Sequence, residues 1–322
     1  HELKKLVPMA LMMLFILFNY TIVRNVKDSL VVNARGSDAE IISFLKLWGT
    51  MPAAVLFMVL YSKMASIFKR ETVFYIFVSG FIAFFGFFAF LMYPNIEYLH
   101  PNHETVYNLQ QYYPNFKWFI SMWGNWSYCV FYILAELWGS VVLSLLFWQF
   151  ANETTKASEA KRHYPLFGFI GNIGLILSGV IITLLCGGRG GEEAVAEFDP
   201  SWELNLKILM SLVCGAGMIT MGLYYWMNRK IVPTLEVGDK TPKKKKPKLS
   251  LSESFKYIVS SRHLLCIAIL VLSYGVTINY IDVLWKGQVK LYTNGDKNAY
   301  TDYMAYLSTL TGLMALVLMP LS

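Results

Sequence analysis

Long apolar segments recur along the whole chain, and they constrain its fold more than any other feature. A transmembrane helix needs about 20 consecutive, mostly apolar residues. Hydrophobic residues make up 56% of the sequence and charged residues only 15%, whereas soluble proteins carry roughly 45–50% and about 25%. A disordered chain, a disulfide scaffold and a compact soluble enzyme are therefore excluded. We predict an all-α polytopic membrane protein with eight helices, over residues 6–33, 41–62, 72–93, 117–149, 164–186, 205–228, 264–285 and 303–322.

Lysine and arginine are distributed unevenly between the two sides that these helices define. With the N-terminus placed inside, 18 of the 28 Lys and Arg residues fall in inner segments and six in outer segments. Inner loops of membrane proteins carry such an excess of positive charge. The bias predicts a cytoplasmic N-terminus. Because the basic residues are confined to a few loops, we do not expect nucleic acid as a partner.

One segment, residues 229–262, divides the chain into two parts. It is rich in proline and lysine and includes the run Lys243–Lys246. Six helices, a basic cytoplasmic loop and further helices are typical of six-plus-six transporters whose two halves are related by a parallel repeat. We therefore predict an N-terminal six-helix bundle over 1–228, a basic cytoplasmic linker over 229–262 and the start of a C-terminal bundle over 263–322.

A faint internal repeat agrees with this division. Asn19–Tyr20 precedes Lys27 in the first predicted helix, and Asn279–Tyr280 precedes Lys286 in the seventh. These two helices superimpose if the halves are related by a parallel repeat. The sequence begins with histidine and stops at 322 while still apolar. We expect it to be truncated at both ends, with about four helices absent.

Charged side chains inside the predicted helices are candidate site residues. An ionisable group in the membrane costs several kcal/mol unless it faces a partner or a polar cavity. Glu136 lies near the middle of the apolar run 126–150. We expect its carboxylate to face a cavity, as a substrate or proton site. The alternative is a structural carboxylate paired with a basic residue of a neighbouring helix.

The first helix carries a second group of charges, Arg24, Lys27 and Asp28. Arg24 and Lys27 are three residues apart, so their side chains share one helix face. Two cations on one face at membrane depth predict an anion site. Asp28 lies four residues after Arg24, and we expect these two to pair and to leave Lys27 free. The alternative is a cluster of snorkelling side chains at the outer membrane boundary.

Other polar residues in the predicted helices have a structural and a functional interpretation. Asp282 and Lys286 share one face of the seventh helix, as part of a site or as a pair that neutralises itself. Asn172, within Gly171–Gly174, is either an interhelical hydrogen-bonding residue or a substrate contact. Lys46 is interpreted as a boundary lysine near the outer end of the second helix.

No pattern in the sequence predicts a metal site, a cofactor or catalytic residues. His100 and His103 share an outer loop without a third ligand, and we expect them to be exposed. The glycine-rich segment 187–191 lacks the Lys-Ser/Thr ending of a P-loop and is interpreted as a flexible turn. No cysteine pair has CxxC spacing. We interpret all four cysteines as helix-packing residues: Cys129, Cys186, Cys214 and Cys266.

Four stretches together carry a family resemblance. They are Asn19–Val32 (NYTIVRNVKDSLVV), Glu136–Glu153 (ELWGSVVLSLLFWQFANE), Glu159–Gly179 (EAKRHYPLFGFIGNIGLILSG) and Tyr274–Lys290 (YGVTINYIDVLWKGQVK). The chain resembles the ATP/ADP translocase family, the nucleotide transporters of obligate intracellular bacteria and plant plastids. The resemblance covers essentially all 322 residues, and the ELWG, FWQFAN and EAKR series is specific.

The resemblance implies a major-facilitator-like fold and the exchange of external ATP for internal ADP by alternating access. Family residues tied to transport fall on Lys27 of the KD motif and on Glu136 of ELWG. The acidic residue ahead of the WK pair falls on Asp282, where the family commonly has Glu, so the carboxylate arm is one methylene shorter. Asn172 falls where the family has an amide facing the substrate. A further family lysine belongs to a late helix that this chain does not include.

The charged residues and the resemblance together give a predicted substrate site. ATP and ADP carry several negative charges, and guanidinium and ammonium groups suit phosphate oxygens. The predicted substrate-binding residues are Lys27, Arg24, Glu136, Asn172, Asp282 and Lys286. We expect a monomer whose partners are ATP, ADP and the lipid bilayer, with no cofactor.

Two other functions are weighed against this exchanger. A proton-coupled nucleotide importer of the same family would use Glu136 and Asp282 to carry the proton. A non-transporting membrane scaffold would bind anionic lipid through its basic linker, but it would have no use for Glu136 and Lys27 inside the membrane. The outer loop 94–116 and the absence of a transit-like N-terminus favour the inner membrane of an intracellular bacterium over the plastid inner envelope. The exchanger would there supply a parasite with host energy.

Overall fold

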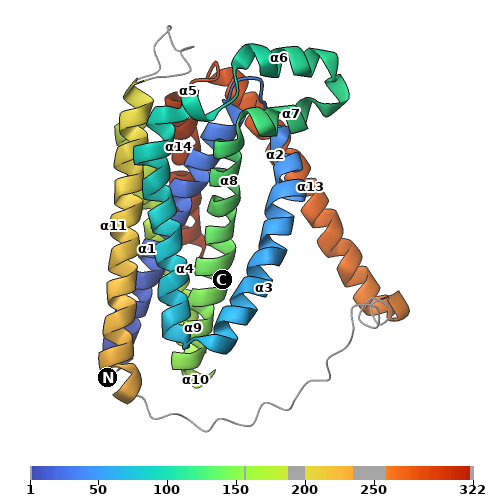
Figure 1. Cartoon of the computed structure of the whole chain (residues 1–322). Helices are drawn as coiled ribbons and strands as arrows, with labels where there is room; N and C mark the ends of the chain where they lie inside the picture. The colour runs from blue at the N-terminus through green and yellow to red at the C-terminus, as the bar shows by residue number, and fades with distance from the viewer. Residues whose placement is uncertain (1, 156, 188–199, 235–258, 320–322) are drawn as a thin grey trace.

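The computed structural model describes residues 2–155, 157–187, 200–234 and 259–319, and these residues form helices joined by short connections (Figure 1). Seven helical segments are long and apolar enough to cross a membrane, which confirms an all-α polytopic membrane protein. They are Lys4–Val32, Ile41–Ile67, Arg70–Leu99, Trp126–Thr154, Glu159–Cys186, Pro200–Lys230 and Arg262–Tyr292. Most of the expected linker, and the glycine-rich segment beyond Gly187, lie outside the described residues.

Three of the spans contain a π-helical segment, a feature that is frequent at functional sites. The first of these spans consists of α2 (Ile41–Phe44), η1 (π, Leu45–Thr50) and α3 (Met51–Ile67). The second consists of α4 (Arg70–Phe87), η2 (π, Phe88–Met92), η3 (3₁₀, Tyr93–Asn95) and α5 (Ile96–Leu99). The third consists of α8 (Trp126–Trp138), η5 (π, Gly139–Phe147) and α9 (Trp148–Thr154). The side chain of Glu136 lies one turn before η5, and Lys46 lies inside η1.

The other long helices are uninterrupted. They are α1 (Glu2–Val32), α10 (Ala157–Cys186), α11 (Pro200–Lys230, followed by the 3₁₀ turn η6, Val232–Thr234), α13 (Arg262–Tyr292) and α14 (Lys297–Leu318). The eighth expected helix, 303–322, corresponds to α14. This segment is helical, but polar residues in its first turns, Asp302 among them, lower its mean hydropathy, and it is not one of the seven candidate spans.

The fourth expected helix, 117–149, is not one continuous helix, so the expectation of a single helix over these residues was wrong. The short helix α7 (Lys117–Gly124) precedes α8, and the backbone between them leaves the helical region at Asn125 (φ −117°, ψ 36°). The side-chain amide of Asn125 donates to the carbonyl of Arg35 at 3.1 Å. Asparagine competes for backbone partners in this way, so a Gly-Asn pair favours a corner over a continued helix.

Segment 94–116, which the sequence predicts as an outer loop, is largely helical rather than an open loop. It contains α5, α6 (His103–Tyr112) and the 3₁₀ turn η4 (Pro114–Phe116). The side chain of Asn102 caps α6 by accepting a hydrogen bond from the backbone N–H of Glu104 at 3.1 Å, as is typical of helix N-termini. Together with α7, these helices lie over one end of the bundle, at the top of Figure 1.

His100 in this segment is half-buried, so the expectation of an exposed loop histidine was wrong. Its Nε2 lies 2.7 Å from the hydroxyl of Ser127, and its ring meets that of Tyr128 edge-on at 5.0 Å. Burial lowers the pKa of His100 to about 4, with further contributions from the positive charges of His103 and Lys297. The imidazole is therefore neutral at physiological pH.

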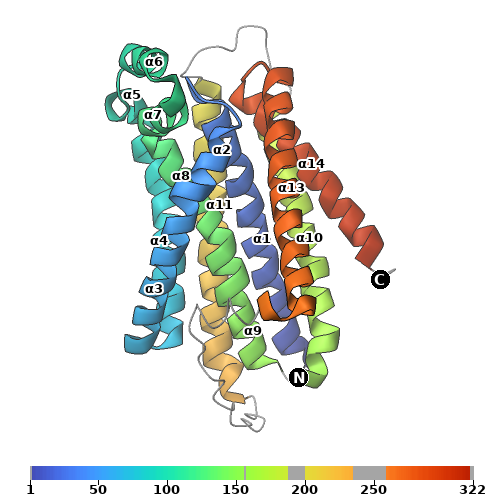
Figure 2. The same cartoon turned by 90° about the vertical axis from the view of Figure 1, so that its right-hand side faces the viewer.

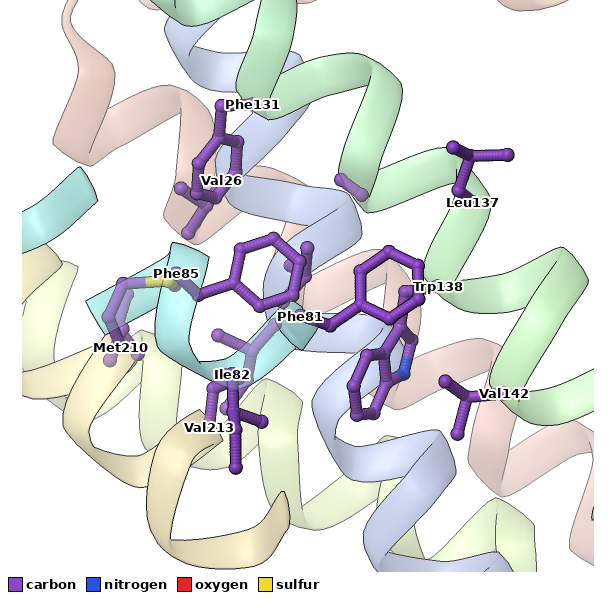
Figure 3. Packing of buried hydrophobic residues seen from close by; sticks show 14 of the residues in the cluster. Val26, Phe81, Ile82, Phe85, Phe131, Leu137, Trp138, Val142, Met210 and Val213 are labelled. Atoms are coloured by element: carbon purple, nitrogen blue, oxygen red, sulfur yellow. The ribbon is translucent and has the colours of Figure 1, made fainter. Parts of the chain in front are cut away.

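The helix α1 forms the centre of the bundle and packs against α8, α10, α11 and α14 (Figure 2). Phe81 and Phe85 of α4 lie beside Trp138 of α8 in this core (Figure 3). The indole N–H of Trp138 donates to the carbonyl of Ile16 on α1 at 3.4 Å. Since lipid tails are as apolar as these side chains, close packing rather than removal from water favours helix association in a membrane.

Two glycines allow α1 to approach its neighbours closely. A Cβ at Gly174 of α10 would lie 2.5 Å from the carbonyl oxygen of Leu14. A Cβ at Gly139, where α8 continues into η5, would lie 2.6 Å from the ring of Tyr20. Small residues at such positions are typical of membrane helix interfaces. The second contact brings Glu136, one turn earlier on the same helix, toward α1.

Two helices bury little of their surface. The described part of α3 has no buried residue, and α13 has two, Lys286 and Val289. Figure 1 shows α13 leaning away from the bundle toward its N-terminal end. This helix therefore contacts the first part of the chain through the end that carries Lys286.

Candidate functional site

The side chain of Lys27, near the C-terminal end of α1, is the first element of the site. It is 3% exposed, and its Nζ lies 2.7 Å from Oδ1 of Asp28 and 2.8 Å from Oε1 of Glu136 on α8. The same ammonium lies 4.0 Å from the centre of the Tyr132 ring, a distance at which a cation is attracted by the aromatic face. Lys27 is thus held between α1 and α8 by two carboxylates and a ring.

The second element comes from α13. The Nζ of Lys286, also 3% exposed, lies 2.9 Å from Oδ2 of Asp28 and 2.9 Å from Oδ2 of Asp282. Asp282 also lies 3.7 Å from Lys46 of η1, which donates to the side-chain carbonyl of Asn279 at 2.6 Å. Asp28, with no exposed surface, therefore has a lysine on each carboxylate oxygen.

These contacts form one row of alternating charges, which we call the ionic cluster. Four elements contribute to it: α1, η1, α8 and α13. Three lysines and three carboxylates balance one another, so the cluster itself is neutral. The order along the row is Glu136, Lys27, Asp28, Lys286, Asp282 and Lys46.

Arg24, one turn before Asp28, lies outside this row. Its side chain is exposed, and it makes no ion pair with the described residues. It therefore adds one unbalanced positive charge beside the neutral cluster. At the two ends of the row, the side chains of Glu136 and Lys46 are 29% and 35% exposed. An anion that approaches from solvent would meet Arg24 and Lys46 before the two buried lysines.

The expected pairing of Asp28 with Arg24 was wrong. The spacing of four residues permits such a pair, but Asp28 turns its carboxylate into the interior, where Lys27 and Lys286 are both within 2.9 Å. For the same reason, Lys27 is not free. A buried carboxylate takes the partners that are buried with it, because an unpaired charge there would be far more costly than at the surface.

Lys46 is not a simple boundary lysine, and sequence reasoning missed its place in the site. Its ammonium contacts Asp282 and Asn279 of α13. The signal was available, because Lys46 is an ionisable residue within a predicted span and such residues face partners or cavities. What the sequence did not supply was the partner, which is more than 200 positions away along the chain.

The other expected site residues separate into two groups. Glu136, Asp282 and Lys286 lie in the ionic cluster with Lys27, so the structure brings four of the six together. Asn172 lies elsewhere: its amide donates to the carbonyl of Gly168 at 3.0 Å and lies 3.9 Å from the sulfur of Met319. The neighbouring Gly171 packs on Leu17 of α1, which is ten residues, or about 15 Å along the helix axis, from Lys27.

The remaining sequence features carry no metal chemistry in the part of the chain that the structure describes. No group of three or more His, Cys, Asp or Glu residues there is placed to hold a metal ion. Cys129 and Cys186 are buried between helices, as expected of packing residues, and Cys214 is half-buried. Cys266 is exposed on α13, so it does not pack against another helix among the described residues as expected.

A cavity of about 390 Å³ lies at the other end of the bundle, between α3, α4, α9 and α11. Its wall includes Phe74, Tyr224 and Tyr61, whose hydroxyl donates to Gln149 at 2.5 Å. Arg70 and Glu153 form an exposed ion pair at this cavity. None of the ionic cluster's residues lines it.

Comparison with known proteins gives a match over the whole sequence. The family model described as TLC ATP/ADP transporter matches residues 1–322. ADP,ATP carrier protein 3 of Rickettsia bellii is 44% identical over 99% of this chain, and the chloroplastic ADP,ATP carrier protein 1 of Arabidopsis thaliana is 43% identical over 99%. ADP,ATP carrier protein 1 of Chlamydia muridarum is 42% identical over 99%. The chain spans 65%, 50% and 60% of the lengths of these relatives. No solved structure matches it.

Proposed function

The chain belongs to the TLC ATP/ADP transporter family, and from this premise we propose that it is part of a membrane antiporter that exchanges external ATP for internal ADP by alternating access. The observation that carries the proposal is the ionic cluster, which links α1 and α8 to α13 through buried lysines. The two nucleotides come from the names of the relatives, which are ADP,ATP carrier proteins. An antiporter of this kind transports its substrates unchanged and is not an enzyme.

The phosphate groups are the part of the substrate that the cluster suits best. Lys27 and Lys286 can each contact a phosphate oxygen as a compact point charge, and Arg24 can form two parallel hydrogen bonds to one phosphate. These three cations come from α1 and α13, on opposite sides of the linker. Phosphates bound between them would therefore contact both halves of a six-plus-six transporter.

The carboxylates have a different task. Glu136 and Asp282 balance the lysines while no nucleotide is present. When phosphates bind, these carboxylates can turn to the ribose hydroxyls or to the base, because each is partly exposed. Asn172, at its distance from the cluster, can only contact a part of the nucleotide remote from the phosphates. An empty site that holds six charged side chains is also reluctant to change the side of the membrane to which it opens. This reluctance favours exchange over one-way transport.

The test uses the full-length protein in proteoliposomes, loaded with ADP or left empty, with uptake of labelled ATP followed with and without a proton gradient. We expect uptake that requires internal ADP and ignores the gradient. Uptake into empty vesicles that collapses with an uncoupler would instead favour a proton-coupled importer. Its proton would reside on Glu136 or Asp282, the two partly exposed carboxylates of the cluster.

The position in the membrane belongs to the same proposal. We place the N-terminus of α1 in the cytoplasm and the ionic cluster toward the outer face, in the inner membrane of an intracellular bacterium, with the protein acting as a monomer. The charge bias of the connecting segments supports this orientation. Labelling of single cysteines introduced at Lys63 and Tyr98 with a membrane-impermeant reagent in intact cells tests it. Only the cysteine at 98 is expected to react.

A further inference from the structure

Asp28 differs from the other carboxylates of the ionic cluster in its burial and in its partners. Its side chain has no exposed surface, whereas those of Glu136 and Asp282 are 29% and 22% exposed. One carboxylate oxygen contacts Lys27 at 2.7 Å and the other contacts Lys286 at 2.9 Å. Asp28 is thus the member of the cluster that joins the two buried lysines.

The partners of Asp28 come from different parts of the chain. The lysine Lys27 lies on α1, and Lys286 lies on α13, beyond the linker. In contrast, the Lys27–Glu136 ion pair joins two helices that both precede the linker, and the Lys286–Asp282 ion pair lies within α13. Lys46 with Asp282 also crosses between the parts, but at 3.7 Å and with partial exposure, so it contributes less.

The same end of α13 makes its other contacts with the first part of the chain. Lys290 donates to the backbone carbonyl of Ser37 at 2.7 Å. A Cβ added at Gly287 would lie 3.7 Å from the Cβ of Ala39. Because α13 leans away toward its other end (Figure 1), separating this contact would free α13 from α1 and α2.

A carboxylate that holds an ammonium on each oxygen resembles a phosphate in what it offers the lysines. Both groups present two or more anionic oxygens, and both form short, charge-assisted contacts with lysine. The nucleotide phosphates of the proposed substrate and the carboxylate of Asp28 would therefore compete for Lys27 and Lys286. If different phosphate groups of one nucleotide take these lysines, Glu136 and Asp282 remain close, but the short Asp28–Lys286 contact gives way to a longer link through the nucleotide, which lets α1 and α13 separate.

We propose that Asp28 is an internal substitute for substrate phosphate, which holds the outer contact of α1 and α13 closed while the carrier is empty and releases it when phosphates take the two lysines. This inference rests on the proposed exchange function and deepens it. An empty carrier would have to break two buried ion pairs to open outward, whereas a nucleotide-loaded carrier would not. Asp28 would thereby make exchange obligatory.

The first test replaces Asp28 in the full-length protein. In Asp28→Asn, Lys27 keeps Glu136 and Lys286 keeps Asp282, so each lysine still has a carboxylate. We expect the ratio of ATP uptake into ADP-loaded vesicles over uptake into empty vesicles to fall by about tenfold relative to the wild type. Because a competitor for the lysines is removed, the apparent KM for ATP should not rise. A carboxylate that merely positions the lysines predicts the opposite, a raised KM with the ratio unchanged.

Asp38→Asn provides the matched control. It removes an exposed carboxylate near the same contact, 3.9 Å from Lys290, without altering either partner of Asp28. The uptake ratio of this variant should equal that of the wild type. Equal falls in both variants would overturn the proposal, because they would show that any lost charge near the contact relaxes the coupling.

The second test measures the contact directly and needs no transport. Ala39→Cys and Gly287→Cys, in a full-length background whose accessible cysteines such as Cys266 are replaced by Ser, would place two Cβ atoms at a distance suited to a disulfide. We expect rapid cross-linking of the empty protein, slowed about tenfold by ADP or by inorganic tripolyphosphate and unaffected by adenosine. Adding Asp28→Asn should slow the reaction without any ligand.

The two tests separate failure of the inference from failure of the proposed function. Cross-linking that is equally fast with and without tripolyphosphate, and equally fast in Asp28→Asn, would overturn the role of Asp28 even if ATP and ADP exchange is observed. Phosphate-sensitive cross-linking in a protein that shows no exchange would leave Asp28 as a phosphate-responsive link and reject the exchange of ATP for ADP.

Discussion

Lys5 of α1 and Glu159 of α10 form an ion pair of 2.7 Å with side chains that are 6% and 19% exposed. Glu159 begins the EAKR motif of the family resemblance. The pair ties the first turns of the central helix and of α10 together at the end of the bundle opposite the ionic cluster. A largely buried pair is costly to break by removing one partner, because the other charge is left without compensation.

Glu159→Gln should therefore destabilise the protein by about 3 kcal/mol. Its thermal unfolding in detergent is expected at a lower temperature than that of the wild type, while the apparent KM for ATP changes little. Glu97→Gln, which alters an exposed carboxylate on α5, is the control and should unfold like the wild type. A KM effect larger than the stability effect would assign Glu159 to the site instead.

Lys27→Ala should raise the apparent KM for ATP by at least about tenfold or abolish exchange. The substitution removes the buried ammonium that contacts both Asp28 and Glu136. Lys63→Ala removes an exposed lysine of α3 and should leave uptake unchanged. The measurement is ATP uptake into ADP-loaded proteoliposomes, and wild-type kinetics in the Lys27 variant would remove this residue from the substrate site.

Arg24→Gln should separate binding from stability. Arg24 is exposed and makes no ion pair with the described residues, so its loss leaves no buried charge unpaired. We expect an unfolding temperature equal to that of the wild type and a weaker affinity for ATP, by about tenfold, because a contact to phosphate is lost. Arg24→Lys should recover part of the affinity. Unaltered affinity in both variants would place Arg24 outside the site.

Gly139→Leu should disturb the site through packing. A side chain at 139 would collide with the ring of Tyr20, whereas at Gly80 of α4 a Cβ would meet no atom within 4 Å. Overpacking a close helix contact costs about 1–3 kcal/mol. It would also move α8, and with it Glu136, away from Lys27. Exchange is expected to fall in Gly139→Leu and to persist in Gly80→Leu, as measured on protein of equal purified amount.

Stability should depend on His100 below neutral pH. The pKa of this imidazole is lowered to about 4 in the folded protein from its usual 6.5, chiefly by burial. Between these values the unfolded chain binds a proton that the folded protein does not, so the free energy of unfolding decreases as pH falls from 6.5 toward 4. Above 6.5 this contribution is complete and constant.

His100→Gln should flatten this dependence. Melting temperatures of both proteins, recorded from about pH 7.5 down to about 4.5, give the comparison. The wild type is expected to lose stability more steeply than the variant over the acidic half of the range. Parallel curves would show that His100 does not titrate in this way.

The architecture followed from the sequence because a bilayer leaves few options for apolar segments of this length. Seven of the eight expected helices correspond to candidate spans, and hydropathy alone was enough to predict where they lie along the sequence. The break at Asn125 was missed, because hydropathy does not register a Gly-Asn corner between two apolar segments. That corner depends on a tertiary hydrogen bond to Arg35, about 90 positions away.

The site was predicted as a set of residues but not as a set of pairs. Membrane depth alone identifies Glu136 and Lys27 as charges in need of partners. Helix spacing then suggested local pairing of Asp28 with Arg24, whereas the structure pairs Asp28 with Lys286, which lies 258 positions later. Partners on different helices depend on helix packing, which spacing along one helix does not contain. Lys46 was misjudged for the same reason.

The different burial of α1 and α13 has a consequence for synthesis at the ribosome. Most of the core around α1 is supplied by residues up to 230, which are made before α13 begins, and α14 adds Tyr300, Met304 and Ala305 later. Lys27, one partner of Asp28, is synthesised immediately before it, but the other partner, Lys286, is synthesised much later. The first six spans can thus insert and pack before Oδ2 of Asp28 has its lysine partner. The insertion of α13 then supplies Lys286 and completes the ion pairs of Asp28.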